Sequence, residues 1–449
     1  MASVERRRLR DHPAGLWVLA GTELWDRISF RGMQALLVLY MVDTLLRPGT
    51  VERIRGFAGL RTAIEALTGP LSVQALAAQV FGLYVAFVYF TPIIGGWIGD
   101  RLTGRRVAVA GGALMMTAGH FALAFDATFL VALLLLILGA GLLRGNLGAQ
   151  VKALYADGDP RAVDAFQLYY IAINLGSFIA PLATGALAAL YGWHVGFAVA
   201  GVGMLIGLVV YLAGQRYLPP DAARVAAVRR VRSTPAERRR IAGLALVFPC
   251  QTGFWIAQSQ VWNVYNLWVR DHVDLRVGGF AVPVPWLQAL DGLAPILAMP
   301  LILALWRHQA ARGREPGAVA KLAIGCAIFA AGTLWLAAAP LVAGGDGRVA
   351  LGWAIVFHLL SNVGWLYFAP TSTALYAMQS PPALRGTLIG ASSLAVFVAS
   401  IVSGRIGGLY ETLSPTAFWS LHAAIVGASG VALLLLAPTL HRRFIGETA

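Results

Sequence analysis

Apolar stretches of about twenty residues recur along the whole chain, and each is long enough to cross a hydrocarbon core of roughly 30 Å. Of the 449 residues, 58% are hydrophobic and 12% are charged, which is about half the usual share of charge in a soluble domain. This pattern predicts an integral membrane protein built from helices. The twelve predicted spans are residues 15–42, 75–98, 107–125, 130–155, 164–190, 194–217, 241–269, 284–306, 318–343, 350–378, 387–410 and 416–437.

The basic residues are distributed unevenly between the two sides of the predicted membrane. Numbering the loops alternately, one side receives the arginines near the N-terminus, those around Arg105 and a cluster within residues 216–240, while the other side receives few. The positive-inside rule then predicts that both termini lie in the cytoplasm. We expect a multi-pass protein of the bacterial cell membrane. Although the net charge is +14, it does not form a stripe, so we expect the lipid bilayer and no nucleic acid as partner.

A polar segment divides the predicted helices into two groups of six. Residues 218–240 contain three prolines and a run of arginines, which predicts a basic cytoplasmic linker. The N-terminal six-helix bundle is predicted over residues 1–217, and the C-terminal six-helix bundle over residues 241–449. This is the layout of the major facilitator fold, whose halves rock about a site near the bilayer midplane.

Four ionisable residues lie inside the first predicted span, in the stretch "GTELWDRISFRGMQAL". Glu23, Asp26, Arg27, Phe30 and Arg31 follow the i, i+3, i+4, i+7, i+8 spacing, which places them on one helix face. A charge facing lipid would cost at least ~2.5 kcal/mol, so we expect this face to line the interior, with pairs such as Glu23 and Arg27. A purely stabilising ion network is the alternative interpretation.

Other kinds of chemistry find little support in the sequence. Cys250 and Cys326 lie in apolar spans without metal-ligand spacing, so we expect packed thiols and no metal site. An intramembrane enzyme would require a constellation such as HExxH or GxSxG, which the sequence lacks. A channel or receptor fits the two-half layout less well than a transporter does.

Several motifs together resemble the proton-coupled oligopeptide transporters of the major facilitator superfamily. The first-span face is similar to the family pattern ExxERFxYYG, and "FQLYYIAINLGSF", residues 166–178, matches the fifth-helix signature, with Tyr169 and Asn174 at restricted positions. "YVAFVYFTPIIGGWIGDRLTGRR" resembles the second helix and its loop motif, and "PALRGTLIG" resembles the start of the eleventh helix. The loop-motif residues, which we expect to act in gating, are Asp100, Arg101 and Arg105.

The resemblance implies a proton-coupled symporter that imports di- and tripeptides, or peptide-like molecules, by alternating access. By this resemblance Glu23, Asp26 and Arg27 couple proton movement to substrate movement, and Arg27 also meets the substrate carboxylate. Protons would be the coupling ion, and no cofactor is expected. We expect a monomer, although the sequence does not fix the oligomeric state.

Four departures from the family pattern affect the expected substrate. "GLLRGNLG" offers Arg144 in place of a lysine, and Gly82 stands where animal members carry a proton-handling histidine. Trp365 replaces the tenth-helix glutamate that holds a peptide's amino terminus, and "WLQALDG" places Asp291 where the family has asparagine. Asp291 is therefore a candidate ligand for a substrate ammonium, unless it pairs with a basic residue of the other half.

The intramembrane charges balance, which favours a substrate with at least one carboxylate. The second hypothesis is therefore a transporter of the same family for a non-peptide carboxylate, such as an amino-acid derivative or a small organic anion. Trp365 could instead be a packing residue, and His120 and His358 are expected to be packed or hydrogen-bonded core histidines. The predicted substrate-binding residues are Arg27, Phe30, Arg31, Tyr89, Arg144, Asn174, Trp286, Asp291 and Trp365.

Overall fold

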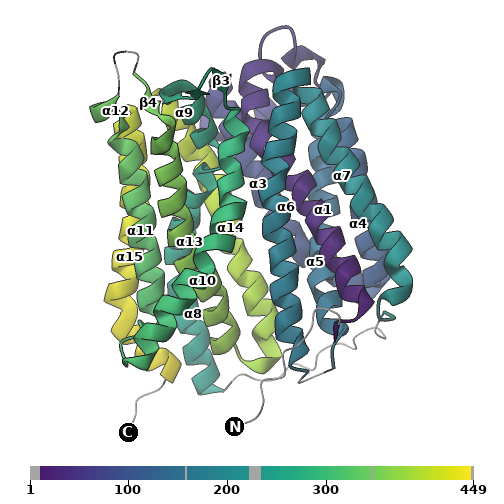
Figure 1. Ribbon diagram of the computed structural model, residues 1–449, viewed down its shortest axis with the longest axis vertical. Helices are drawn as coiled ribbons and strands as arrows, with labels where there is room; N and C mark the ends of the chain where they lie inside the picture. Colours follow the sequence, from purple (N-terminus) through teal and green to yellow (C-terminus); the bar gives the residue numbers. More distant parts are fainter. Residues whose placement is uncertain (1–10, 157–158, 222–233, 344, 346, 446–449) are drawn as a thin grey trace. The chain divides into compact units, whose positions relative to one another are not determined.

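The computed structural model describes residues 11–156, 159–221, 234–343, 345 and 347–445, and helices dominate it (Figure 1). Eleven of the described helices are long and apolar enough to cross a membrane. The predicted span over residues 107–125, which is not among these eleven, corresponds to α4, Arg105–Ala122, which begins with two arginines. The all-helical prediction is thereby confirmed, whereas four of the eight arginines within residues 216–240 and the arginines at positions 6–10 lie outside the described residues.

The described residues form two compact units. The first unit comprises the described parts of Met1–Met33 and Thr91–Ala227, and the second those of Gln34–Phe90 and Val228–Ala449. Two helices, α1 at Ala14–Tyr40 and α3 at Val73–Ile98, contribute to both units.

In the first unit, α4 packs against α5 and α7, and α6 packs against α7. Small residues allow this approach, because a Cβ atom added to Gly112 of α4 would lie 2.6 Å from the carbonyl oxygen of Gly139 on α5. Of these helices, α5 spans Phe129–Ala153, α6 spans Arg161–Tyr191 and α7 spans Trp193–Gly214.

In the second unit, α11 packs against α13 and α15, while α8 packs against α14 and α15. The helices are α2 at Phe57–Thr68, α8 at Pro235–Gln260, α9 at Val264–His272, α10 at Leu290–Ala311, α11 at Ala318–Ala337, α12 at Ala339–Val342, α13 at Leu351–Gln379, α14 at Arg385–Gly407 and α15 at Pro415–Ile445.

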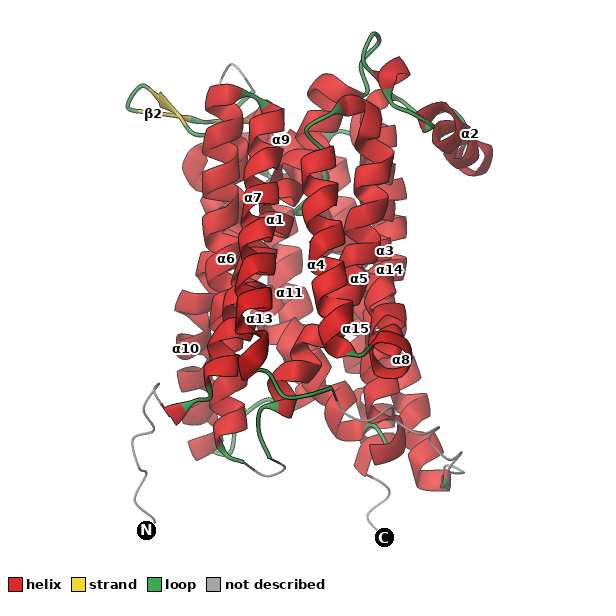
Figure 2. Cartoon of the chain, turned by 90° about the vertical axis from the view of Figure 1, so that its right-hand side faces the viewer, coloured by secondary structure: helices red, strands yellow, loops and turns green. Residues whose placement is uncertain are grey.

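Four short strands join helices of the second unit. The strand β1, Val273–Asp274, pairs in parallel with β4, Val349–Ala350. The strands β2, Arg276–Val277, and β3, Phe280–Ala281, form an antiparallel hairpin that is yellow in Figure 2.

The predicted span over residues 241–269 is interrupted in the structure, which corrects that expectation. Helix α8 begins with a capping box between Thr234 and Glu237 and ends at Gln260, and α9 begins only at Val264. At the break, Gln260 Nε2 donates to Ser403 O at 2.8 Å, and Asn263 Nδ2 donates to Ala78 O at 3.2 Å. Polar side chains that bind the backbone of α14 and α3 therefore take the place of a continuous helix.

Helix α2, Phe57–Thr68, is a short surface helix between the first two spans. Ile64 is buried on this helix and Leu67 is exposed. The Glu65 carboxylate accepts hydrogen bonds from the Leu71 backbone N–H at 3.1 Å and from Arg61 Nε at 3.0 Å, which lower the pKa of Glu65. These bonds fasten the segment that leads from α2 into α3.

Candidate functional site

Helix α1 buries both acids of the predicted coupling motif within the first unit. Glu23 is 1% exposed and Asp26 is 0% exposed, so neither carboxylate meets bulk solvent. A buried carboxylate needs a charged or hydrogen-bonded partner, because desolvation of the charge otherwise costs several kcal/mol. The structure supplies such partners from α1 itself and from α5 and α6.

Glu23 lies between Arg27 and Tyr169. Arg27 Nε donates to Glu23 Oε1 at 2.7 Å, and Arg27 Nη2 lies 2.6 Å from the same oxygen. The Tyr169 hydroxyl on α6 donates to the other carboxylate oxygen, Oε2. The expected pair of Glu23 and Arg27 is confirmed, and the hydroxyl of Tyr169 completes the set of partners around the carboxylate.

Asp26 is held by Arg144 of α5. The guanidinium donates through Nε to Asp26 Oδ2 at 3.1 Å and through Nη2 to Oδ1 at 3.2 Å, which is a bidentate arrangement. The Arg144 guanidinium also lies 4.0 Å from the ring centroid of Phe30, a cation–π distance. Arg27 Nε is 3.6 Å from Asp26 Oδ2, so Asp26 also links the two arginines.

The result is a buried cluster of two acids and two bases, each acid with an arginine of its own. Protonation of either acid removes the negative charge that holds an arginine and leaves a guanidinium with donors to satisfy. A substrate carboxylate could satisfy those donors, since paired N–H groups of arginine match the two oxygens of a carboxylate. The geometry therefore allows protonation of an acid to favour the binding of a substrate carboxylate to the arginine, and the reverse.

A second charged group lies inside the second unit, where α10 and α13 pack together. Asp291 Oδ1 lies 2.9 Å from His358 Nδ1 and accepts a hydrogen bond from Asn362 Nδ2, also at 2.9 Å. His358 is fully buried, whereas the Asp291 side chain is 11% exposed. The expectation of a hydrogen-bonded core histidine is confirmed for His358.

The other predicted binding residues have the following places. Asn174 is buried and donates to Tyr170 O within α6, while the Arg31 guanidinium lies 5.8 Å from the Phe30 ring centroid. Trp286 lies in a 3₁₀ segment before α10, with its ring 5.6 Å from that of Phe280 on β3. The remaining two are Tyr89, partly buried on α3, and Trp365, which packs against the core cluster of α10 and α13.

The predicted loop motif lies at the turn from α3 into α4. Arg105 Nε donates to Asp100 Oδ1 at 2.8 Å, and Arg101 is exposed. The next residue, Arg106, was not among the predicted gating residues. Its Nε donates to Pro219 O at 3.1 Å and its backbone N–H donates to Asp221 at 3.2 Å, so Arg106 fastens the beginning of the linker to the first unit.

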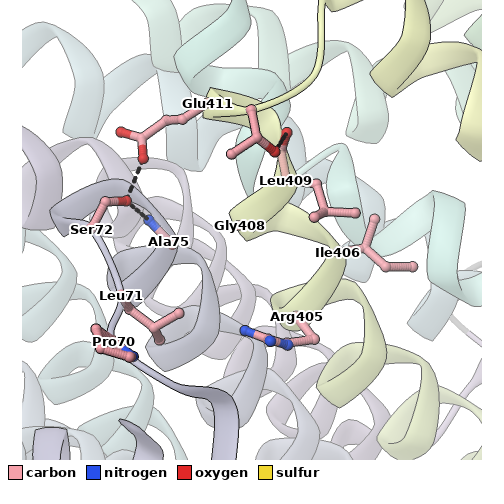
Figure 3. A pocket seen from close by; sticks show the side chains of 10 residues that line it. Pro70, Leu71, Ser72, Ala75, Arg405, Ile406, Gly408, Leu409 and Glu411 are labelled. Atoms are coloured by element: carbon pink, nitrogen blue, oxygen red, sulfur yellow. Dashed lines mark hydrogen bonds between the residues drawn. The ribbon is translucent and has the colours of Figure 1, made fainter.

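An open cavity of about 340 Å³ in the second unit lies apart from all predicted site residues (Figure 3). Ser72 at the start of α3 donates to the carboxylate of Glu411, and its hydroxyl accepts from Ala75 N–H at 3.1 Å. Arg405 on α14 donates to Thr68 O at 3.0 Å. These contacts tie α14 to the segment between α2 and α3.

Sequence reasoning missed the partners that come from distant helices. Tyr169 was noted as part of a signature and as an aromatic residue, but its bond to Glu23 spans 146 positions and has no local signal. His358 and Asn362 stand at i and i+4, which places both on one face of α13, yet nothing in the sequence paired them with Asp291. Among the described residues no group of three His, Cys, Asp or Glu side chains could hold a metal ion.

The chain is similar to characterised transporters along nearly its whole length. The peptide transporter YePEPT of Yersinia enterocolitica is 26% identical over 97% of this chain and 96% of its own, and a di-/tripeptide transporter of Lactococcus lactis is 25% identical over 94% and 95%. A crystal structure of a peptide transporter POT in complex with alafosfalin superposes with a TM-score of 0.83 at 26% identity, covering 98% of this chain and 97% of that one.

The predicted twelve-helix major facilitator fold is confirmed by this structural match. The model of the POT family matches residues 106–231 and 221–419, which is more than half of the chain. The motifs of the first half, the buried cluster on α1 and these matches agree, and the chain belongs to the POT family.

Proposed function

We propose that this protein is a proton-coupled symporter that imports di- and tripeptides, or peptide-like small molecules, by alternating access. As a member of the POT family it is a multi-pass membrane transporter and not an enzyme. Relatives named as peptide and di-/tripeptide transporters over nearly the full chain length support peptides as the substrate class.

The observation that carries proton coupling is the buried cluster of the first unit. Glu23 and Asp26 are both fully enclosed, and each depends on an arginine, Arg27 or Arg144, for its charge balance. In our proposal one of these acids takes up a proton, and the arginine that is released binds the substrate carboxylate. Proton and substrate then move together, because each removes the electrostatic cost of the other.

For the opposite end of the substrate we propose Asp291 as the ligand. A carboxylate that is largely buried strengthens a charge-assisted hydrogen bond to an ammonium, and Asp291 retains 11% exposure. Trp365 stands three positions after Asn362, which itself contacts Asp291, so the indole lies on the same face of α13. An aromatic ring on this face would suit a cation or an apolar substrate side chain.

The proposal also covers the membrane location, orientation and oligomeric state of the protein. The protein would act as a monomer in the bacterial cell membrane, with both termini in the cytoplasm, and protons would be its only coupling ion. The asymmetry of arginines between loops supports this orientation. Gating would involve the pair of Asp100 and Arg105 together with Arg101 at the turn between α3 and α4.

The proposal is tested with purified protein in lipid vesicles. We expect a labelled dipeptide to accumulate above its external concentration when the vesicle interior is made alkaline, and the accumulation to collapse when a protonophore removes the gradient. Uptake that only equilibrates the dipeptide would contradict coupling. Failure of the dipeptide to enter, combined with gradient-driven uptake of an amino-acid derivative or organic anion, would favour the second hypothesis.

That second hypothesis, a non-peptide carboxylate as substrate, is favoured by Trp365. The residue packs against Ile302, Leu366 and Tyr367, so it fills a core position where an acid would be needed to hold an ammonium. The two hypotheses are separated by the variant Asp291→Asn. If Asp291 binds the substrate ammonium, this variant should reduce uptake of a free-amino dipeptide roughly tenfold more than uptake of the N-acetylated form, because only the charged amine loses an ion pair.

If Asp291→Asn reduces the uptake of both dipeptides equally, Asp291 does not bind the substrate ammonium. Such a result would assign the carboxylate to the internal structure of the second unit and favour a substrate without an amino group.

A further inference from the structure

We propose that the open cavity between the end of α14 and the start of α3 binds a phospholipid whose headgroup carries a primary ammonium beside its phosphate. In this site the Arg405 guanidinium binds the phosphate and the Glu411 carboxylate binds the ammonium. The inference does not depend on which substrate is transported, because it requires only that the chain spans a membrane.

The walls of the cavity, which encloses about 340 Å³, are held together by contacts within the second unit. Gln74 Nε2 on α3 donates to Gly407 O of α14 at 3.0 Å. A Cβ atom added to Gly408 would lie 3.1 Å from Ala75 Cβ, so the two backbones approach each other closely here. The cavity is therefore formed before any ligand binds, which lowers the ordering cost of binding.

Two opposite charges line this cavity without pairing with each other (Figure 3). Arg405 is exposed, and within the described part of the chain it donates only through Nη2, to Thr68 O at 3.0 Å. Glu411 is also exposed, and the Ser72 hydroxyl donates to only one of its carboxylate oxygens, Oε2. A ligand with both an anion and a cation can use the remaining donors of Arg405 and the remaining oxygen of Glu411.

The spacing of the two charges fits a headgroup better than a single ion. Arg405 and Glu411 stand six positions apart, which places their Cα atoms roughly 9–12 Å apart along the helix axis. The paired N–H groups of arginine match two phosphate oxygens, and a carboxylate accepts the N–H groups of an ammonium. In phosphatidylethanolamine an ethylene link joins the phosphate to the ammonium, so one headgroup can reach both side chains.

The position of the cavity along the spans identifies the source of the phosphate. The apolar spans Val73–Thr103 and Arg385–Glu411 each have one end beside this cavity. The ends of membrane spans lie at the headgroup region that flanks the hydrocarbon core. A long basic side chain near the end of a span reaches toward this polar region, so phospholipid phosphates are the anions that Arg405 meets.

An apolar stripe on α14 leads from the cavity toward the middle of the span. Val398, Val402 and Arg405 follow the i, i+4, i+7 spacing of one helix face, and Leu409 continues the stripe in the cavity wall. Val398 is 38% exposed and Leu409 is 40% exposed. A lipid whose headgroup occupies the cavity can place an acyl chain along this stripe. A soluble dipeptide, which is also a zwitterion, lacks such a chain.

The test measures which lipids the purified full-length protein retains in competition. The protein would be equilibrated in detergent with equal amounts of phosphatidylethanolamine, phosphatidylcholine and phosphatidylglycerol of identical acyl chains, and bound lipids would be counted by native mass spectrometry. We expect the wild type to retain phosphatidylethanolamine roughly tenfold more than either competitor. The choline ammonium has no N–H to donate to Glu411, and the glycerol headgroup has no cation.

Two substitutions separate the two ends of the headgroup. Glu411→Gln keeps an oxygen that can accept from Ser72 but loses the charge, so the preference for phosphatidylethanolamine over phosphatidylglycerol should fall roughly tenfold. Arg405→Gln should reduce retention of all three lipids roughly tenfold, because the phosphate that they share loses its partner. The controls Glu52→Gln and Arg276→Gln remove exposed charges of the same unit outside the cavity and should retain lipids like the wild type.

Equal retention of the three lipids by the wild type would overturn the inference without any variant, as would an unchanged preference in Glu411→Gln. An excess of alanyl-alanine in the same sample should leave phosphatidylethanolamine bound. Displacement of the lipid by the dipeptide would assign the cavity to a soluble zwitterion and contradict the lipid site. Because no outcome is read from uptake, failure of this inference is distinguishable from failure of the proposed function.

Discussion

Arg27 contacts both acids of α1, and we also propose it as a ligand of the substrate carboxylate. It donates to Glu23 at 2.7 Å and lies 3.6 Å from Asp26, and it is also the proposed carboxylate ligand. Lysine would keep the charge but lose the planar pair of donors. The substitution therefore separates the geometry of the guanidinium from its charge.

We predict that Arg27→Lys weakens uptake of carboxylate substrates roughly tenfold, because one charge-assisted hydrogen bond is worth about 1.5–3 kcal/mol. The matched measurement uses the methyl ester of the same dipeptide, which presents no carboxylate and should lose much less. If acid and ester lose equally, Arg27 only holds Glu23 and Asp26 in place.

Tyr169 offers a second prediction at the scale of the residue. Its hydroxyl donates to Glu23 Oε2, so Tyr169→Phe removes one hydrogen bond from the ionised acid while keeping the ring. The ionised carboxylate of Glu23 then keeps Arg27 as its partner but loses a hydrogen bond worth about 1.5–3 kcal/mol. Gradient-driven uptake of a dipeptide should therefore fall roughly tenfold.

Unchanged gradient-driven uptake in Tyr169→Phe would show that the hydroxyl does not contribute to coupling at Glu23. Tyr170→Phe is the control, since Tyr170 is a neighbour on α6 with an exposed side chain.

The residue level also shows what the sequence could and could not predict. The face shared by Glu23, Asp26 and Arg27 followed from helical spacing, because partners at i+3 and i+4 are fixed by the helix itself. The bonds from Tyr169 and Arg144 join helices that are far apart in the chain, so they depend on packing that no local pattern encodes. His358 looked like any core histidine for the same reason.

At the scale of the element, helix α3 illustrates how one glycine sets a helix contact. A Cβ atom added to Gly82 would lie 2.6 Å from Ser400 O and 2.8 Å from Gly404 Cα on α14. The position at which animal relatives were expected to carry a histidine is therefore filled here by the backbone of α14. A side chain at Gly82 requires the two helices to separate.

We predict that Gly82→Ala destabilises the protein by about 1–3 kcal/mol, the usual cost of overpacking a close contact. Thermal unfolding in detergent would show a lower midpoint than that of the wild type. Gly111→Ala on α4 is the control, because nothing lies within 4 Å of its added Cβ and alanine favours a helix. Equal midpoints for the two variants would contradict the close α3–α14 contact.

The start of the linker gives a further prediction at this scale. Arg106 donates to the carbonyl oxygens of Leu218 and Pro219, and its backbone binds Asp221. Arg106→Ala should raise amide hydrogen exchange at Leu218 and Asp221 roughly thirtyfold, because two side-chain hydrogen bonds of about 1 kcal/mol each are lost. Arg105→Ala, which breaks only the pair with Asp100, should leave exchange there unchanged.

Amide exchange at Leu218 and Asp221 that does not respond to Arg106→Ala would mean that other contacts hold this segment.

Helix boundaries show a similar limit of prediction from sequence. The spans followed from apolar length, but the break between Gln260 and Val264 arises from side chains that bind the backbone of α14 and α3. Gln260 at this break binds Ser403, which lies 143 positions further along the chain, so no local pattern predicts the break.

In the whole molecule, proton coupling has to satisfy two opposed requirements on the charged cluster of α1. The cluster on α1 must be neutral to be buried, yet a carboxylate substrate needs a free arginine. A proton on Glu23 or Asp26 meets both demands at once.

The fold of the whole chain was predictable because apolar length, loop charge and family motifs are local signals repeated many times. The substrate was less predictable, since Trp365 and Asp291 depart from the pattern and their meaning depends on neighbours. The structure places Trp365 against a core cluster, which agrees with its alternative interpretation as a packing residue. It also places Asp291 beside His358, which the sequence did not indicate.

The most direct test of the central claim is Glu23→Gln in vesicles, assayed in two modes. Glutamine keeps the shape and hydrogen bonding of the side chain but cannot cycle a proton. We predict that accumulation of a dipeptide driven by a pH gradient is abolished, while exchange of labelled for unlabelled dipeptide persists at a rate close to that of the wild type. Glu65→Gln, on the surface helix α2, should accumulate normally, and gradient-driven accumulation by Glu23→Gln at the wild-type level would contradict coupling at this residue.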